Sequence, residues 1–504
     1  MLIDVIHRIY AGYPIIAVNT VEEGRFAAAL HACLAGNYQI FSIEEGGTLR
    51  QVGPNGELLK CREGLTFQDA FRFAADRATD NDEPKVLVVF DVQHRIKAAA
   101  TYRALKNVAS LLKQRDCHVI LVAPLWGENL PEELRSDLTM LDFELPNADE
   151  LRERLTAVSE GSRGATTVPG KAAEVERLTD AAKGLTLEQA ENAYALSSTR
   201  LQKFDAETIR KQKMLTIKGY GFLEVFNPVA AASIGGLNSL KEFTLREIIP
   251  SMADPELAVR GILLVGVPGT GKSLVAKAMG AYLDRSVIRF DVSAMKGKYV
   301  GSSEENVRTA IRVVDAIGKS VVWIDEIEKA VGGHASSAQS DGGTTLGMVG
   351  ILLSWMQERS SDTLIVATCN DFSKLPPELC RKGRFDEIFF VDLPSAPERA
   401  EIAKVHLDRF KIRADSLPEF IASRTDQFTG AEIEAAIKSA ARRTSRKVNQ
   451  SAMETAITEV NPIAKTNAEY ITSLREFAKA RFRIANTVHE DNAQSRVSRT
   501  LPKK

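Results

Sequence analysis

The sequence is poor in the features that mark secreted, membrane-spanning or zinc-binding proteins. Its 504 residues include five cysteines, an odd number, and these form neither a CxxC pair nor a Cys/His cluster. We therefore expect no disulfide framework and no zinc site, and a reducing compartment is favoured. No run reaches the ~18 uninterrupted apolar residues of a membrane span. Because Asp4, His7 and Arg8 interrupt the apolar N-terminus and no cleavage site follows, we expect no signal peptide and a cytosolic protein.

An excess of charge of one sign is also missing. Lys and Arg together number 65, and Asp and Glu 66, which gives a formal net charge of −1. This balance excludes a global basic field for nucleic acid or an anionic membrane, and leaves only a local basic patch. The composition is otherwise that of an ordinary globular protein, with 44% apolar and 26% charged residues. The length predicts about three domains.

Short β-branched runs alternate with helical patterns in two series, which predicts an α/β fold with parallel sheets covered by helices. A stretch of loop composition, 159–170, follows the first series. The expected domains are an α/β domain at 1–158, a helical lid and linker at 171–232, a second α/β domain at 233–395, a helical lid with C-terminal helices at 396–484, and a disordered tail at 485–504.

The two halves resemble each other. NLPEELRSDLTMLDFELP from Asn129 aligns with KLPPELCRKGRFDEIFFVDLP from Lys374, and LTLEQA from Leu185 aligns with FTGAEI from Phe428. The strand-like VLVVFD at 86–91 parallels VVWID at 321–325. The order is the same in both halves, which predicts two copies of one fold. The alternative is that two unrelated α/β domains share such echoes.

The segment GVPGTGKS, 266–273, follows an apolar strand and opens a helical pattern. Its glycines let the backbone N–H groups form a nest for phosphates, to which the helix adds its positive end. We expect Lys272 to reach the β- and γ-phosphates and Ser273 to bind Mg²⁺. The nucleotide would lie on Pro268, Gly269, Thr270, Gly271, Lys272, Ser273 and Leu274.

Two further strands end in polar residues that suit catalysis. VVWIDE ends in Asp325, a candidate Mg²⁺ ligand through water, and Glu326, a candidate general base for the attacking water. LIVATCN ends in Asn370, which would bind the γ-phosphate or orient water, or simply begin a turn. In RKGRFDE, Arg381 and Arg384 would stabilise charge on a neighbouring subunit's nucleotide across a head-to-tail interface, unless they form surface salt bridges.

In this order, GVPGTGKS, VVWIDE, ATCN and RKGRFDE resemble the AAA+ ATPases, specifically the AAA proper group with its GRFD second region of homology. This resemblance covers Ser233 to about Val448. IRKQKMLTIKGYGFLEVFNP at 209–228 and WIDEIEKA are similar to a sub-family of algal plastid and cyanobacterial genomes, known as a hypothetical chloroplast reading frame. The likeness implies tandem P-loop-like AAA+ modules with helical lids, ATP and Mg²⁺ as cofactors, a hexameric ring, and the cytoplasm or the plastid stroma.

The resemblance also assigns roles by position. Ile234 and Gly235 match the segment that packs beside adenine, or form an ordinary turn. Gly430 and Ala431 match a small pair in the lid that would sense nucleotide through backbone contact. Finally, the family's first pore loop, which in a ring would grip an extended polypeptide, matches Lys298, Tyr299, Val300 and Gly301, although Tyr299 has the alternative of packing within its own subunit.

The first half departs from this pattern. NTVEEGRF, 19–26, stands at the phosphate-loop position, with Gly24 and Arg25 set against Gly271 and Lys272. Its two glutamates, Glu22 and Glu23, put negative charge where phosphates would lie. Aligning Asp91 with Asp325 leaves Val92 where the base Glu326 stands. We therefore expect a degenerate first module and an active second one.

Three functions remain open. The first is an ATPase that remodels or threads a protein client, recruited directly or through an adaptor. The second is a nucleic-acid-associated motor or loader, for which the sequence offers only scattered basic residues and no recognised binding motif. The third is a scaffold whose assembly is switched by nucleotide.

Overall fold

The computed structural model describes residues 2–44, 46–53, 57–76, 83–124, 126, 132–135, 138–161, 167–219, 221–252, 254, 256–295, 302–331, 342–359, 362–381, 383–413, 416–479 and 481–487. The expected pore loop, Lys298 to Gly301, lies outside these residues, as does most of the expected tail. The chain divides into two units, Met1–Lys213 and Met214–Lys504. Each unit is described by itself.

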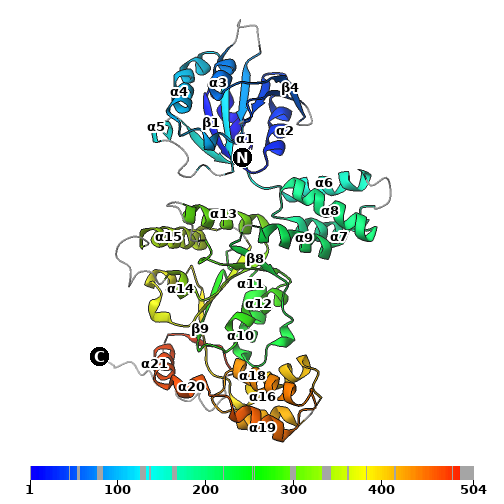
Figure 1. Ribbon diagram of the computed structural model, residues 1–504, viewed down its shortest axis with the longest axis vertical. Coiled ribbons are helices and arrows are strands. Elements are labelled where there is room, and N and C mark those ends of the chain that lie inside the picture. Colours follow the sequence, from blue (N-terminus) through cyan, green and yellow to red (C-terminus); the bar gives the residue numbers. More distant parts are fainter. Residues whose placement is uncertain are drawn as a thin grey trace, which may run out of the picture. The chain divides into compact units, whose positions relative to one another are not determined.

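Unit 1 contains a seven-stranded sheet with helices on both faces, followed by a helical subdomain (Figure 1). The strands are β1 (Ile15–Asn19), β2 (Gln39–Ile43), β3 (Leu49–Val52), β4 (Leu58–Arg62), β5 (Lys85–Val89), β6 (His118–Ala123) and β7 (Thr139–Asp142). The helices of the sheet domain are α1 (Leu2–Tyr10), α2 (Glu23–Leu34), α3 (Phe67–Ala75), α4 (Ala99–Gln114) and α5 (Glu132–Arg135). The helical subdomain comprises α6 (Ala148–Gly161), α7 (Ala172–Ala182), α8 (Leu187–Leu201) and α9 (Ala206–Lys218), and the unit boundary falls within α9.

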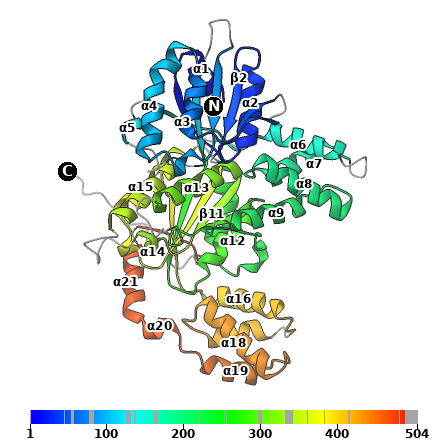
Figure 2. The ribbon, with the colours of Figure 1, turned by 45° about the horizontal axis from the view of Figure 1, so that its top comes forward.

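Unit 2 repeats this plan. Its strands are β8 (Leu223–Phe226), β9 (Gly261–Gly266), β10 (Ser286–Phe290), β11 (Ser320–Ile324), β12 (Thr363–Cys369), β13 (Glu387–Val391) and β14 (Arg483–Ile484). Helices around the sheet are α10 (Asn238–Phe243), α11 (Ile249–Ser251), α12 (Lys272–Tyr282), α13 (Ser302–Ile317), α14 (Ile327–Val331), α15 (Gly342–Glu358), α20 (Ile463–Thr466) and α21 (Ala468–Lys479). The lid consists of α16 (Ala396–Arg409), α17 (Leu417–Arg424), α18 (Gly430–Arg443) and α19 (Gln450–Thr458), and has a core of its own (Figure 2).

The two sheets share one topology. The parallel strands of unit 1 lie in the order β2-β5-β6-β1-β7, and the matching strands of unit 2 in the order β10-β11-β12-β9-β13, with the short β14 as a further parallel strand beside β13. Numbered along the chain, both orders read second, third, fourth, first, fifth. The expectation of tandem α/β modules is therefore confirmed by the strand order as well as by the element types. In each unit, the loop that leaves the first strand starts at the carboxyl edge, where ligands bind in such sheets.

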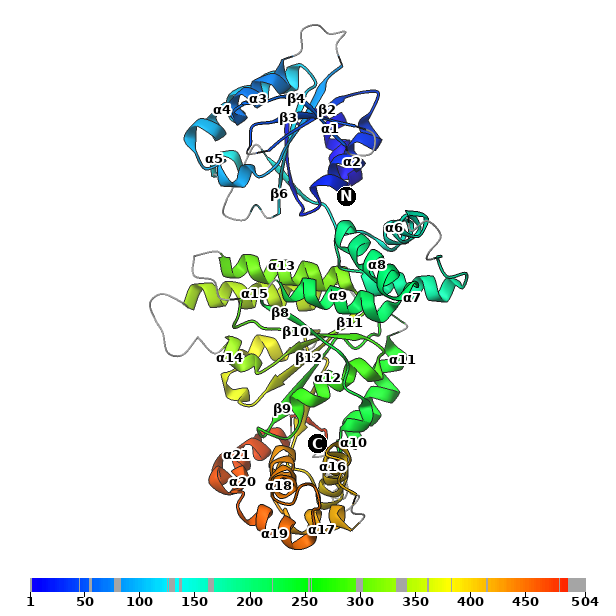
Figure 3. The ribbon, with the colours of Figure 1, turned by 45° about the vertical axis from the view of Figure 1, so that its right-hand side comes forward.

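Helices cover both faces of each sheet, as parallel strands require. In unit 1, α1 and α2 pack on one face and α3 and α4 on the other. In unit 2, α10 and α12 pack on one face, and α13, α15 and α21 on the other (Figure 3). The central strands β9 and β12 are buried along their whole length, which explains their unbroken apolar runs. Within the described residues, no helix is both long and apolar enough to cross a bilayer.

The structure adds strands that the sequence pattern did not reveal. The hairpin strand β4 is exposed throughout, so it carries no apolar alternation. Strand β8 pairs antiparallel with β10, although its residues fall in the range assigned to the lid and linker. The second sheet therefore begins before Ser233.

The expected tail is also too long. Residues 485–487 are ordered: the Ala485 N–H donates to the Phe390 carbonyl at 2.9 Å, and the Thr487 N–H to Glu398 Oε1 at 2.9 Å. The reason is β14, a strand of two residues that pairs with β13 and is too short to leave a pattern.

Candidate nucleotide site

The phosphate loop of unit 2 has the backbone that anion binding requires. Five residues, 267–271, connect β9 to α12. Gly269 has φ of 82° and Gly271 φ of 92°, a left-handed conformation that residues with a Cβ rarely adopt. These turns, with the N-terminus of α12, direct backbone N–H groups toward one point above the strand edge.

Lys272 lies within this loop and is buried, with 6% of its surface exposed. Its Nζ donates to the carbonyls of Gly266 at 2.9 Å and Val267 at 2.8 Å. Burial lowers the pKa of Lys272 to about 8, although nearby Cys369, Glu328 and Asp325 act in the opposite direction. A buried ammonium held only by carbonyls gains from any anion that reaches it, which is what a triphosphate supplies.

Three oxygen-bearing side chains meet beside the loop. Ser273 Oγ lies 2.9 Å from Asp325 Oδ1, to which it donates. Thr368 Oγ1, from the neighbouring strand β12, donates to the same carboxylate oxygen at 2.7 Å. Thr368 Oγ1 also accepts the N–H of Glu326 at 2.9 Å. Thr368 therefore fixes both Asp325 and the start of the segment that carries Glu326.

Glu326 and Asn370 face each other. Asn370 Nδ2 donates to Glu326 Oε1 at 2.9 Å, and Lys329 Nζ lies 2.5 Å from Glu326 Oε2. Glu326 has a left-handed backbone with φ of 49°, an unfavourable conformation for a side-chain-bearing residue and one that recurs at functional sites. The carboxylate is thus aimed by backbone and side-chain contacts together.

The lid closes the other side of the site. The Ala431 N–H donates to the Gly269 carbonyl at 3.1 Å, so the start of α18 contacts the phosphate loop directly. A Cβ at Gly235 would lie 2.6 Å from the backbone nitrogen of Ile402 on α16. Gly235 must therefore be glycine for the lid to approach the segment that carries Ile234.

One cavity of about 400 Å³ gathers these residues, a size that suits a small-molecule ligand. It is lined by Ile234, Gly235, Pro268, Gly269, Thr270, Gly271, Lys272, Ser273, Leu274, Asp325, Glu326, Asn370, Gly430 and Ala431, all expected from the sequence. It is also lined by Leu237, Thr368, Ile402, His406, Arg409 and Glu434, which the sequence analysis missed. The hydroxyl of Thr368 inside a buried strand was the one available signal. The others lie on lid helices or loops, and only the fold brings them here.

The two predicted arginines are the exception. Arg381 is exposed, and Arg384 Nη1 donates to the Glu378 carbonyl at 2.6 Å. Neither lines the cavity of its own chain. The structure therefore brings together the loop, the carboxylates and Asn370, and leaves the guanidinium groups outside.

Unit 1 lacks a phosphate loop at the matching place. Only three residues, 20–22, separate β1 from α2, so Gly24 lies inside the helix. The expected match of Arg25 with Lys272 is therefore wrong. The buried faces of the two helices coincide when Glu23 is set against Lys272, which matches Phe26, Ala27 and Leu30 with Val275, Ala276 and Met279.

The match of Asp91 with Asp325 is also wrong. Val86, Val88 and Phe90 face α2, as Val321 and Trp323 face α12. Continuing this alternation puts buried Phe90 at the place of Asp325, and Asp91 at that of Glu326. Asp91 and Glu326 share the left-handed backbone, with φ of 56° and 49°. Unit 1 therefore keeps a carboxylate at the base position and has lost the metal ligand, the reverse of the expectation.

In unit 1 the side chain of Glu22 lies where a bound phosphate would lie in unit 2. Its carboxylate accepts the N–H of Leu187 at 2.5 Å, at the start of α8, and lies 2.7 Å from Arg25 Nε. Arg25 Nη1 also pairs with Glu150 of α6 at 2.9 Å. Burial raises the pKa of Glu22, and burial together with Asp91 and Glu44 raises that of Glu23 to about 7. The site is thus occupied by carboxyl groups of its own chain and already bonded to its helical subdomain.

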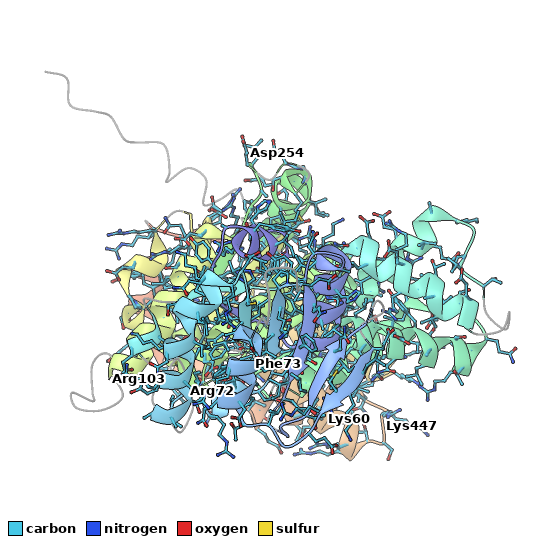
Figure 4. The ribbon with its side chains drawn as sticks, turned by 90° about the horizontal axis from the view of Figure 1, so that it is seen from above. Lys60, Arg72, Phe73, Arg103, Asp254 and Lys447 are labelled. Carbon is cyan, nitrogen blue, oxygen red and sulfur yellow. The ribbon has the colours of Figure 1, made fainter. Side chains whose placement is uncertain are left out.

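Another cavity, of about 650 Å³, lies in unit 1 and is lined by residues of α3, of α4 and of the segment that follows β4. Arg72 and Phe73, labelled in Figure 4, contribute to its wall. Its charged lining consists of Arg62, Arg72, Arg115, Glu63, Asp69 and Asp76. Because the two signs balance, this cavity has no evident preference for an anionic ligand, and it contains none of the expected site residues.

Known proteins match all parts of the chain. The family profile described as "ATPase family associated with various cellular activities (AAA)" matches residues 262–393. Those described as "SpoVK-like AAA ATPase, N-terminal domain" and "second domain" match residues 4–143 and 149–219. A relative from Sulfurisphaera tokodaii, "Proteasome-activating nucleotidase", is 32% identical over 279 residues, which are 52% of this chain and 69% of that protein.

Relatives that match along most of the chain carry the name "Uncharacterized AAA domain-containing protein ycf46". The one from Guillardia theta is 32% identical over 489 residues, 93% of both chains. The one from Pyropia yezoensis is 30% identical over 486 residues, 92% of this chain and 95% of its own. With the phosphate loop, the carboxylate pair and the lid assembled around one cavity, the chain belongs to the AAA ATPases, enzymes that hydrolyse ATP, and its first half consists of SpoVK-like domains.

Proposed function

We propose that unit 2 hydrolyses ATP with Mg²⁺ in the cavity at Lys272, and that copies of the chain form a ring in which this reaction remodels a protein client. The observation that carries the catalytic part is the chain of contacts from Ser273 through Asp325 and Thr368 to Glu326 and Asn370. Each group in it has a chemical role, and together they form one site.

The residues fit a magnesium ion. Ser273 and Asp325 offer two oxygen donors, the kind that Mg²⁺ prefers. Within the described part of the chain, no group of three or more His, Cys, Asp or Glu side chains could hold a metal alone. This agrees with an ion that completes its shell with phosphates and water. When bound, Mg²⁺ would neutralise charge on the phosphates.

The protein's own groups perform the remaining tasks. The loop N–H groups and Lys272 bind the phosphates, Glu326 accepts the proton of the attacking water, and Asn370 holds Glu326 in place by its amide. The balanced proton transfer leaves a protonated Glu326, ADP and phosphate. Positioning of this kind supplies most of the catalysis in phosphoryl transfer.

The position of the arginines supports the proposed ring. Arg381 and Arg384 lie outside the cavity of their own chain, where a guanidinium gives no help to its own nucleotide. In a head-to-tail assembly they would reach the γ-phosphate of the next chain. The name of the Sulfurisphaera relative ties that protein to proteasome activation, which supports a protein client for this one. The cytoplasm and the plastid stroma both stay predictions for its location.

We further propose that unit 1 binds no nucleotide. Its short loop has no nest, Phe90 replaces the metal ligand, and Glu22 and Glu23 would repel phosphates. Equilibrium titration of the full chain with ATP should therefore give one site per chain, lost entirely in Lys272→Ala. A second site that survives this substitution would overturn the proposal.

Glu326→Gln tests the catalytic assignment and the client together. The variant keeps the size of Glu326 and an oxygen that can accept the Asn370 amide, but it loses the ion pair with Lys329 and removes the base. It should bind ATP normally, hydrolyse it at least about 100-fold more slowly, and retain a protein client in ATP that Lys272→Ala fails to retain. Hydrolysis at the wild-type rate would refute the role of Glu326, and a client held equally by both variants would refute nucleotide-driven remodelling.

A further inference from the structure

We propose that Tyr470, on the C-terminal helix α21, is a positioning residue that holds Asn370 in its catalytic place. Tyr470 lies beyond residues 262–393, the part that matches the AAA profile. The inference rests on the role proposed above for Asn370. It concerns residues 463–479 and 481–487, named here the C-terminal strap, which leaves the lid and returns to the large sheet (Figure 2).

Asn370 needs support that its strand does not give. Strand β12 ends at Cys369, and the ladders to β11 and β9 end at Ala367 and Cys369. Asn370 therefore stands one residue beyond the sheet. Its N–H donates to Glu328 Oε1 at 3.0 Å, which fixes one of its two peptide groups.

Tyr470 fixes the other peptide group. Its hydroxyl donates to the carbonyl of Asn370. Burial, with Asp371 and Glu328 nearby, raises the pKa of Tyr470 to about 12, so the hydroxyl keeps its proton at neutral pH. With both peptide groups held, the Cα–Cβ bond of Asn370 has a fixed direction, from which its amide reaches Glu326 Oε1, 2.9 Å away.

Aromatic packing supports the same segment. Phe372, two residues after Asn370, contacts Phe477 of α21 and Phe482 just beyond it, with ring centroids 5.3 and 4.9 Å apart. Arg475 Nε donates to both carboxylate oxygens of Asp392 at 2.9 Å. The helix that carries Tyr470 is thus fixed to the large domain by several contacts, which keep the backbone of Tyr470 beside Asn370.

The beginning of the strap contacts two other elements of the nucleotide site, the lid and the phosphate loop. The Ile463 N–H donates at 2.7 Å to Glu432, which also caps α18 of the lid. Ala464 and Ile471 pack on Val267 of the phosphate loop. One continuous segment therefore contacts the lid, the phosphate loop and Asn370. A shift of the lid on nucleotide binding would be transmitted to Tyr470 through the short helix α20 and the start of α21.

Tyr470→Phe tests the inference because it removes one oxygen and keeps the ring. The hydrogen bond it deletes predicts that kcat for ATP falls about 3- to 10-fold, with KM, ADP affinity and melting temperature nearly unchanged. Thr472→Val is the matched control. That hydroxyl, on the same helix, donates only to the Ala468 carbonyl at 2.9 Å, and its loss should leave kcat as in wild type.

The same substitution in an Asn370→Ala background separates this inference from the proposed function. If Tyr470 acts through the Asn370 amide, Tyr470→Phe should lower kcat by less than about 1.5-fold there. An equal loss in both backgrounds, or no loss in either, would overturn the positioning role. A normal rate for Asn370→Ala alone would instead refute the role given to Asn370.

Discussion

At the scale of single residues, Thr368 makes a testable claim, because its hydroxyl joins Asp325 to the backbone of Glu326. Thr368→Val keeps the shape and removes both bonds. Loss of a bond to a charged group costs about 1.5–3 kcal/mol, so we expect kcat to fall about 10- to 100-fold. Thr363→Val is the control: this hydroxyl lies at the other end of β12 and donates to the Gly318 carbonyl at 3.0 Å. If both variants lose stability but neither loses turnover, the network is only structural.

Lys272 gives a pH dependence whose sign follows from its environment. Burial lowers its pKa to about 8, and bound phosphates favour the charged form, so the pKa rises when ATP binds. Above pH 8 binding must therefore take up a proton, and affinity should fall with rising pH, by up to tenfold per unit. Below pH 7.5 the titration of Lys272 should leave the affinity for ATP unchanged. Calorimetric titration with a non-hydrolysable ATP analogue from pH 7.5 to 9.5 measures this, and constant affinity across that range would contradict the assignment.

The residues that line the nucleotide cavity differ in how far the sequence around each of them predicts its place in the site. The phosphate loop, Asp325, Glu326 and Asn370 are each read from a strand followed by a few letters, because backbone conformation and side-chain chemistry are set within one turn of the chain. Thr368 is visible only once its strand partner is known. His406 and Glu434 depend on how the lid packs, which no local pattern encodes.

At the scale of elements, an alignment based on residue types alone gave a wrong match for the segment formed by β1, its loop and α2. The letters of NTVEEGRF align with a phosphate loop at Gly24 and Arg25. The structure instead has a loop two residues shorter, and the face alternation of β5 moves Phe90 to the metal-ligand place. The two faces of a strand follow from the core that each side chain enters, and this alternation is therefore the more dependable guide. Strands β8 and β14 escaped because four and two residues show no period at all.

Two substitutions in this first element should have opposite effects. Glu22→Ala removes a buried carboxylate that holds Leu187 and Arg25, and should destabilise unit 1 by about 1–3 kcal/mol.

Glu23→Gln should stabilise unit 1 at pH 8. The folded-state pKa of Glu23, about 7 against 4.5, means that its stabilising effect is lost as pH rises from 4.5 through 7, and the amide escapes that loss. Hydrogen exchange of α2 and α8 peptides in the full chain reports both. A change of the same sign in the two variants would contradict the roles given to the two side chains.

At the scale of the whole molecule, the position of the arginines predicts that two inactive chains can repair each other. Lys272→Ala binds no ATP but still presents Arg384. Arg384→Ala binds ATP but has lost one of the two guanidinium groups that it would offer to its neighbour. Each variant alone should hydrolyse ATP at least 10³-fold below wild type if an arginine finger is at work, by about 4 kcal/mol or more.

Mixed in equal amounts, the two chains form some junctions at which an intact ATP site meets an intact arginine. Random assembly gives about a quarter of the junctions this arrangement, and the mixture should recover about a quarter of wild-type turnover. A twofold dilution should then reduce the rate of ATP hydrolysis per chain, since junctions between chains are lost. The control is a mixture of Lys272→Ala with Glu326→Gln, in which every junction lacks a competent ATP site, and which should stay inactive. If the first mixture shows only the sum of its parts, Arg384 acts within its own chain or not at all, and the cavity of unit 2 is complete without a neighbour.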